Sequence, residues 1–179
     1  MDDFYNLPSG VVEALTEKTD VQGRVLAPYD PLQLLTDNLK DPNREITTNK
    51  NEESLYDLDW WLEQRNRKYD WVVAVTIGSR EYNKYIMEYG MEVANKGLIV
   101  LDRLSFIEPV SKRKKFLLDN PMSKMIVLSP RPKFRAIGST RDSVTACWFV
   151  FEKNPASVKT EIVYALDWDA VKPLTPFQS

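Results

Sequence analysis

The 179-residue sequence contains no histidine. This absence excludes Ser-His-Asp and Cys-His catalysis, and it removes the residue on which most zinc sites depend. General acid–base chemistry would have to use aspartate, glutamate, lysine or tyrosine side chains instead. We therefore expect no metal site and no enzyme that relies on an imidazole.

Cysteine occurs once, at Cys147, inside the apolar run 144–151. One cysteine cannot form an internal disulfide, and a buried structural thiol is favoured over a nucleophile because no histidine could activate it. An unpaired cysteine fits a reducing compartment, so we expect a cytoplasmic protein. No stretch is long or apolar enough to span a bilayer, and residues 1–3 do not begin a signal peptide, so we expect no membrane contact.

Charges of the two signs nearly balance, because 24 Lys+Arg against 26 Asp+Glu give a net charge of −2. Binding of nucleic acid would therefore need a local basic patch. Two stretches qualify, one over 112–115 and one over 131–141. Their basic residues are Lys112, Arg113, Lys114, Lys115, Arg131, Lys133, Arg135 and Arg141. The alternative interpretation of both stretches is an ordinary solvated surface.

The chain is long enough for a single domain over 1–179, with a core at about 5–153 and a C-terminal strand and tail over 154–179. Runs of β-branched and apolar residues predict strands, and apolar residues three to four apart predict helices. The predicted strands are 23–26, 45–48, 71–75, 98–101, 125–128, 144–151 and 162–166. The predicted helices are 8–18, 57–65, 80–96 and 112–119, with another opening at Asp30-Pro31.

The strands alternate with helices, and their apolar runs are continuous rather than alternating. This pattern is typical of a mostly parallel sheet that is covered on both faces. The last strands follow one another without a helix between them, which favours antiparallel pairing at one edge. We therefore predict an α/β fold, a Rossmann-like three-layer sandwich. At the end of a sheet strand, Asp102 and Arg103 are either an ion pair or loop anchor, or part of a site.

Three strings in the second half of the chain support a closer comparison. They are RLSFIE at 103–108, VLSPRPKF at 127–134 and DSVTACWFV at 142–150. With the order of the elements, they make residues 5–153 resemble the small DNA adenine methyltransferase-like proteins of phages and mobile elements. These proteins are a branch of the class I, Rossmann-like methyltransferases. The resemblance implies S-adenosylmethionine as cofactor and three functional stations.

The first station is the turn after the first strand. The family has an acidic residue and glycines there, because larger side chains would collide with the methionine part of the donor. In this chain Ala27 stands at the acid position, Pro28 matches the family and Tyr29 follows. No glycine occurs in the remainder of the turn, through Gln33.

The second station is the end of the second strand, where the family uses an acid to accept hydrogen bonds from the ribose hydroxyls. Here the chain has Asn49 and Lys50. Asn49 could still bond to a hydroxyl, but it offers no carboxylate. If the donor were bound nonetheless, Asp57 or Asp59 could contact its adenine.

The third station follows the strand at 71–75, where the family has Asp or Asn, two prolines and an aromatic residue. The polar side chain and a backbone carbonyl hold the target amino group, and the aromatic ring stacks on the flipped base. The corresponding residues are Val75, Thr76, Ile77 and Gly78. Valine cannot accept a hydrogen bond from an amine, isoleucine cannot fix the turn as proline does, and glycine cannot stack.

Three lost stations predict a catalytically degenerate protein without a cofactor, since each lost contact costs about 1–3 kcal/mol. We expect a non-catalytic module that binds nucleic acid or a protein and that can form a homo-oligomer. One alternative is an active S-adenosylmethionine-dependent DNA adenine methyltransferase with diverged motifs. Another is an inhibitor or partner subunit of a host modification, restriction or other defence enzyme, which the acidic stretch 52–63 would suit.

Overall fold

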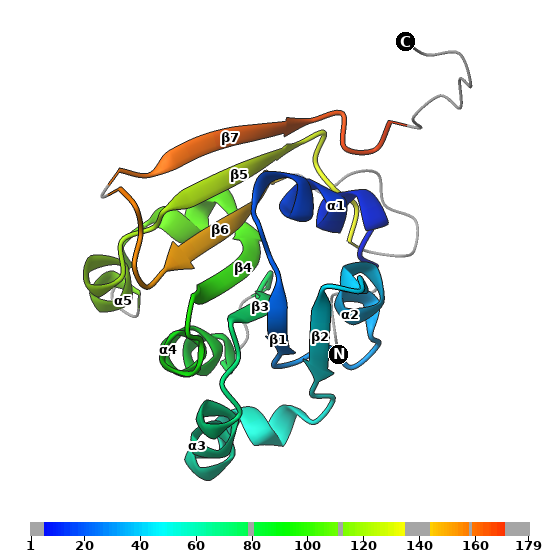
Figure 1. Cartoon of the computed structure of the whole chain (residues 1–179). Helices are drawn as coiled ribbons and strands as arrows, with labels where there is room; N and C mark the ends of the chain where they lie inside the picture. The colour runs from blue at the N-terminus through cyan, green and yellow to red at the C-terminus, as the bar shows by residue number, and fades with distance from the viewer. Residues whose placement is uncertain (1–5, 79–80, 111–112, 135–143, 158, 171–179) are drawn as a thin grey trace.

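A single sheet forms the middle layer of the molecule (Figure 1). The computed structural model describes residues 6–78, 81–110, 113–134, 144–157 and 159–170. Within these ranges the sheet has seven strands in the order β2-β1-β3-β4-β6-β5-β7. The strands are β1 (Gly23–Ala27), β2 (Arg44–Thr48), β3 (Trp71–Val75), β4 (Gly97–Arg103), β5 (Lys124–Ser129), β6 (Ala146–Glu152) and β7 (Glu161–Leu166).

Six of the seven strands in the described ranges run in the same direction. β2, β1, β3 and β4 pair in parallel, and β5 pairs in parallel with β7. β6 is reversed and forms antiparallel pairs with β4 on one side and β5 on the other. The predicted mostly parallel sheet with antiparallel pairing towards one edge is therefore confirmed, with β5 and β7 lying outside the reversed strand.

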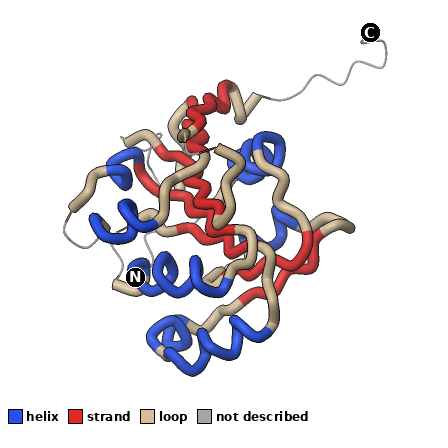
Figure 2. Tube along the Cα trace, turned by 60° about the vertical axis from the view of Figure 1, so that its left-hand side comes forward, coloured by secondary structure: helices blue, strands red, loops and turns tan. Residues whose placement is uncertain are grey.

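Helices cover both faces of this sheet, which gives three layers (Figure 2). One face carries α1 (Ser9–Lys18) and α2 (Leu34–Leu39). The other carries α3 (Leu58–Asn66), α4 (Asn83–Val93) and α5 (Lys114–Asp119), with the 3-10 helices η1 (Glu52–Tyr56) and η2 (Leu104–Ile107). Among the described helices, none has both the length and the apolar character needed to cross a bilayer.

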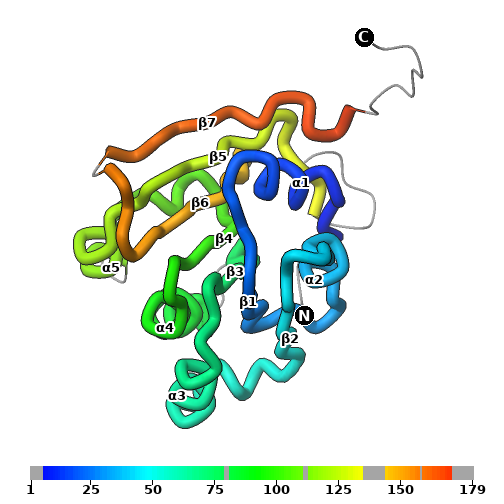
Figure 3. Tube along the Cα trace, in the orientation of Figure 1, coloured from blue at the N-terminus to red at the C-terminus, as the bar shows by residue number. Residues whose placement is uncertain are grey.

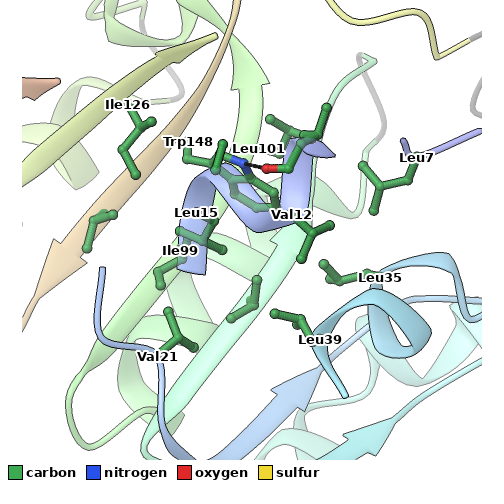
Figure 4. Close-up of a cluster of buried hydrophobic side chains, with 14 of the residues drawn as sticks. Leu7, Val12, Leu15, Val21, Leu35, Leu39, Ile99, Leu101, Ile126 and Trp148 are labelled. Atoms are coloured by element: carbon green, nitrogen blue, oxygen red, sulfur yellow. Dashed lines mark hydrogen bonds between the residues drawn. The ribbon is translucent and has the colours of Figure 1, made fainter. Parts of the chain in front are cut away.

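The core under α1 is built around Trp148 of β6. Its indole Nε1 donates a hydrogen bond of 2.8 Å to the carbonyl oxygen of Val11 in α1. Figure 4 shows Trp148 among Leu15, Ile99 and Ile126, which come from α1, β4 and β5. The tryptophan therefore fixes the first helix of the chain against strands from its second half.

The core on the other face is rich in aromatic rings. Phe106 of η2 packs on Phe149 of β6 with ring centroids 4.9 Å apart, and Phe116 of α5 meets Phe151 at 5.1 Å. Figure 3 places α4 and α5 along this side of the strands. Ring pairs of this kind add to the stability that their buried area provides. They hold the residues after β4 against the reversed strand.

The other predicted elements are confirmed with small shifts in their ends, but the helix expected to open at Asp30-Pro31 begins only at Leu34. Asp30 still caps it, since its carboxylate accepts hydrogen bonds from the backbone N–H groups of Leu35 and Thr36 at 3.3 and 2.7 Å. Gln33 has φ 56°, so a turn separates Pro31 from the helix. The two 3-10 helices were not predicted.

Candidate functional site

The loops that follow β1, β2, β3, β4 and β5 share one edge of the sheet, because these strands run in the same direction. In open α/β sheets this carboxyl edge is where ligands bind. All three stations and both basic stretches follow one of these strands along the chain.

At the first station, the acid of the turn is used to build the turn itself. Asp30 is buried, and besides its two backbone donors it accepts a hydrogen bond of 2.7 Å from the Thr36 hydroxyl. That hydroxyl also lies 2.6 Å from the hydroxyl of Thr48, the last residue of β2. Leu32 is 60% exposed and so points away from the interior of the turn. Asp30 thus joins the β1 loop, α2 and β2 into one hydrogen-bonded unit.

At the second station, Asn49 ties the end of β2 to the β1 loop. Its side-chain Nδ2 donates to the carbonyl oxygens of Pro28 and Asn51, both at 2.9 Å. Its Oδ1 accepts from the backbone N–H of Asn51 at 3.2 Å. Both ends of the amide are therefore engaged inside the protein.

The neighbouring candidates at this station have different surroundings. Lys50 is exposed. Asp57 is the N-cap of α3, and its carboxylate accepts a hydrogen bond of 2.9 Å from the backbone N–H of Asp59. Capping of this kind satisfies a backbone donor that the first turn of a helix leaves unpaired.

At the third station, Thr76 is buried and bonded to the end of β4. Its hydroxyl donates a hydrogen bond of 2.7 Å to Oδ2 of Asp102, and its backbone N–H donates to the carbonyl of Leu101 at 2.9 Å. Gly78 has φ +96°, a value that L side chains rarely adopt. An aromatic side chain at Gly78 would therefore require a different backbone in this turn.

Asn83, in the first turn of α4, clamps the same loop from the other side. Its Nδ2 donates to the carbonyl oxygens of Thr76 at 2.7 Å and of Gly78 at 2.8 Å. The Thr76 carbonyl lies at one of the positions with which the family holds the target amine. In this chain it already accepts a hydrogen bond from within the protein.

Two tyrosines meet between the first and third stations. Tyr29 follows β1 and Tyr82 precedes α4, and their rings form an edge-to-face pair with centroids 5.1 Å apart. Tyr82 is buried and Tyr29 is half-buried. The rings therefore occupy space between the loop expected to hold the donor and the loop expected to hold the target.

Asp102 is a titratable group with an altered environment at this edge. Burial raises the pKa of its carboxyl to about 6, although hydrogen bonds from Thr76 and from the Arg103 backbone act in the opposite direction. Oδ1 accepts the Arg103 N–H at 2.7 Å. Asp102 thus links the end of β4 to the residue that follows β3.

The surroundings of Cys147 favour a structural role for its thiol. Cys147 is fully buried in β6, and burial raises the pKa of its thiol to about 12. In the described part of the chain, no group of three or more cysteine, aspartate and glutamate side chains gathers as a metal site would require.

A surface pocket of about 490 Å³ lies beside β2. It is lined by Thr36, Lys40, Asp41, Pro42, Arg44 and Ile46.

The described basic candidates lie in two segments, one before and at the start of α5 and one directly after β5. Arg113 precedes α5 after β4, and its guanidinium lies 5.0 Å from the ring centroid of Phe106. Lys114 and Lys115 begin α5 and are exposed, and Lys115 forms an ion pair with Asp119. After β5, Arg131 is exposed and Lys133 is half-buried. The other three candidates, Lys112, Arg135 and Arg141, lie outside the described residues.

Comparison with solved structures identifies the architecture. A modification subunit assigned to a type I restriction enzyme of Vibrio vulnificus aligns with TM-score 0.56 and 14% identity, over 91% of this chain and 46% of that one. A predicted O-methyltransferase of Agrobacterium tumefaciens aligns at 0.53 and 10% identity, over 89% and 86%. The fold is that of the class I methyltransferases.

A protein of Listeria monocytogenes assigned to the class I S-adenosylmethionine-dependent methyltransferases gives the same result. It aligns with TM-score 0.53 and 15% identity, over 88% of this chain and 62% of that one. The chain thus spans about half to two thirds of two of these methyltransferase-fold chains. The sequence matches no family model and no curated protein. At such low identity, the likeness concerns the fold.

Sequence reasoning missed the roles of Tyr82 and Asn83, which it placed only within a predicted amphipathic helix. The local sequence gave little indication of these roles, because aromatic and amide residues are common near the start of a helix. Asp102 was recognised as a candidate because it ends a strand. Its contact partner Thr76, just after β3, is 26 residues away in the chain, so no local pattern could reveal the contact.

Proposed function

We propose that this chain is a class I methyltransferase fold that has lost methyl transfer and serves as a binding module. The observation that carries this proposal is that polar groups and rings at the carboxyl edge of the sheet contact one another within the chain. Asn49 and the Thr76 carbonyl have hydrogen-bond partners within the chain, and Tyr29 and Tyr82 meet between the two loops. These contacts support the loss of the donor site, and we derive no catalytic step through S-adenosylmethionine.

Nucleic acid is the ligand class we propose for this module. Support comes from Arg131 and Lys133, which come directly after β5 at the carboxyl edge, and from Arg113, which lies against Phe106 of η2 after β4. The positive charges there contrast with the slightly acidic chain as a whole. Contacts with phosphates require only such local positive charge, whatever the net charge of the protein. The proposal includes the phage or mobile-element origin suggested by the three sequence strings.

Two measurements test the proposal separately. Calorimetric titration with S-adenosylmethionine should give flat heats, and affinity tighter than about millimolar would restore the active-methyltransferase alternative, since millimolar binding corresponds to only about 4 kcal/mol. Fluorescence anisotropy with single- and double-stranded oligonucleotides at low salt should show binding. The logarithm of the affinity should fall linearly with the logarithm of the salt concentration.

Charge variants locate the nucleic-acid contact. Replacing Arg131 and Lys133 by glutamine should weaken oligonucleotide binding and reduce the salt slope by up to about one unit per lost phosphate contact. Lys40→Gln, directly after α2, is the control, because Lys40 is exposed and pairs with Asp37 outside the carboxyl edge. Absence of binding at low salt, or equal loss in the control, would contradict the nucleic-acid proposal.

A protein partner is a second candidate function, favoured by the surface of η1 and α3. Tyr56, Leu58 and Leu62 are exposed large apolar residues there, and acidic residues surround them at 52, 53, 57, 59 and 63. A basic protein surface with an apolar centre would complement this region. Pull-down from a host lysate with the wild-type chain and with Leu62→Lys tests it. A partner retained equally by both would exclude this surface.

A further inference from the structure

The strand β7 forms one edge of the sheet (Figure 1). Three of its exposed side chains are large and apolar. Ile162, Tyr164 and Leu166 are 56%, 62% and 66% exposed. Their register neighbours in β5 include Met125 and Val127, which belong to the α3–α5 side of the core. The three side chains thus form one row on that side of the sheet. A row of this kind on an open edge is a template for pairing with another strand.

The backbone of β7 is also ready for pairing. The N–H of Glu161 donates to the carbonyl of Ser123, just before β5, at 2.9 Å, and the N–H of Asp167 donates to the carbonyl of Ser129 in β5 at 2.8 Å. Because backbone groups alternate in direction along a strand, the odd-numbered residues face β5. The N–H and C=O groups of Ile162, Tyr164 and Leu166 therefore face the free edge. No other strand pairs with this edge within the described residues.

We propose that β7 pairs with β7 of a second copy of this chain, antiparallel, so that two sheets join into one around a two-fold axis. A two-fold contact is self-complementary, which is the common form of a homodimer. The proposal concerns a surface away from the carboxyl edge and does not depend on the proposed function.

The charges at the ends of β7 select the orientation and the register. Lys159 precedes the strand and Asp167 follows it, and both are exposed. Antiparallel pairing centred on Val163 brings Lys159 near Asp167 of the second copy just beyond both ends of the paired segment, where Asp167, with φ 52°, begins a turn. Glu161 then faces Ala165, so no two like charges are opposed. Opposite charges across paired strands are stabilising, whereas like charges are not.

The same register brings the apolar row into contact with itself. Ile162 faces Tyr164 of the second copy, twice by symmetry, and both side chains lie on the same side of the joined sheet. A β-branched residue opposite an aromatic is a favoured cross-strand pair. Because their backbone groups face the free edge, the two residues would form a hydrogen-bonded pair with Cα atoms about 5.5 Å apart.

The first test is the mass of the chain in solution, measured by sedimentation equilibrium over a concentration series. We expect a monomer–dimer equilibrium for the wild-type chain and a monomer for Tyr164→Lys, since a charge at the centre of the row opposes pairing. Leu58→Lys on α3 is the matched control and should keep the dimer, because Leu58 is equally an exposed apolar residue. A wild-type monomer at every concentration, or loss of the dimer in both variants, overturns the proposal.

The second test fixes the register by disulfide trapping. Ile162→Cys and Tyr164→Cys, mixed and oxidised, should form a cross-linked dimer, since a Cα separation of about 5.5 Å suits a disulfide. Neither variant alone should cross-link to a comparable extent. The native Cys147 is fully buried and gives no background. Cross-linking of Tyr164→Cys alone would overturn the register, and no cross-link in the mixture would overturn the pairing.

Discussion

The ring of Tyr29 meets the ring of Tyr82 edge to face, with centroids 5.1 Å apart, across the two loops that the family uses for donor and target. The contact joins the end of β1 to the start of α4, which are 53 residues apart. It packs the loop after β1 against the segment that leads into α4. The edge therefore contributes to the stability of the fold.

The Tyr29–Tyr82 contact can be measured by a double-mutant cycle. Replacing both tyrosines by leucine, singly and together, should show a coupling energy of about 0.5–1.5 kcal/mol in urea unfolding, because edge-to-face rings attract beyond their buried area. Tyr29 with Tyr89 is the control, since Tyr89 stacks on Tyr85 in the middle of α4. Additive effects for Tyr29 and Tyr82 would contradict the proposed role of the contact.

Asn83 should hold the loop after β3 in place. Asn83→Ala removes the donors to the Thr76 and Gly78 carbonyls and should cost about 1–3 kcal/mol, because buried acceptors lose their partners. Hydrogen exchange in a peptide spanning 72–78 should accelerate more than in β6. Asn38→Ala removes a single hydrogen bond within α2 and is the matched control. Unchanged exchange in the loop would show that the clamp is dispensable.

Asp102 should make stability depend on pH. The carboxyl pKa is about 6 in the folded chain, above its usual value of 3.8, so the folded state retains the proton longer. The contribution of this retained proton to the free energy of unfolding is fully present below about pH 4, and it is lost as the pH rises through about 6.

Asp102→Asn should therefore stabilise the protein by about 2 kcal/mol above about pH 7, since one pKa unit corresponds to about 1.4 kcal/mol and some solvent contact remains. Asparagine can accept from Arg103 and donate to the Thr76 hydroxyl, so both contacts survive. The gain should vanish towards about pH 4. Urea unfolding across this range provides the measurement, with the exposed Asp20→Asn as control. A pH-independent difference would rule out titration of Asp102 as its cause.

Cys147 should be inert in the folded protein. Burial raises the pKa of its thiol to about 12, so almost no thiolate forms at neutral pH, and only the thiolate reacts readily. An aromatic disulfide reagent should detect no thiol in the native chain and one after unfolding in guanidinium. Rapid reaction of the native chain would indicate that β6 opens far more easily than its burial implies.

Trp148 should be among the most sensitive core positions. Trp148→Phe removes the hydrogen bond to Val11 and leaves a cavity, so we expect a loss of about 2–4 kcal/mol in the free energy of unfolding. Trp60→Phe on α3 is the control and should cost less than about 1 kcal/mol, because Trp60 is only half-buried. Equal losses at the two positions would contradict the central role of Trp148 in the core.

The elements could be predicted because each has a local cause. The β-branched run Trp71–Val75 and the apolar spacing of Ile86 and Val93 depend on neighbouring residues alone. The start of α2 could not be predicted. Asp30-Pro31 is a good local start signal, but the Thr36–Thr48 hydroxyl contact holds the helix further along the chain. Contacts with β2 therefore set where the helix begins.

By itself the sequence determined the alternation of strands and helices, the absence of imidazole chemistry and the unusual residues at the three stations. These features depend on composition and short spacing. Only the tertiary structure decided that β6 lies between β4 and β5, that Tyr29 reaches Tyr82 and that Thr76 bonds to Asp102. The physical reason is that strand order and contacts between loops arise from packing among residues distant in the chain, which short-range patterns do not encode.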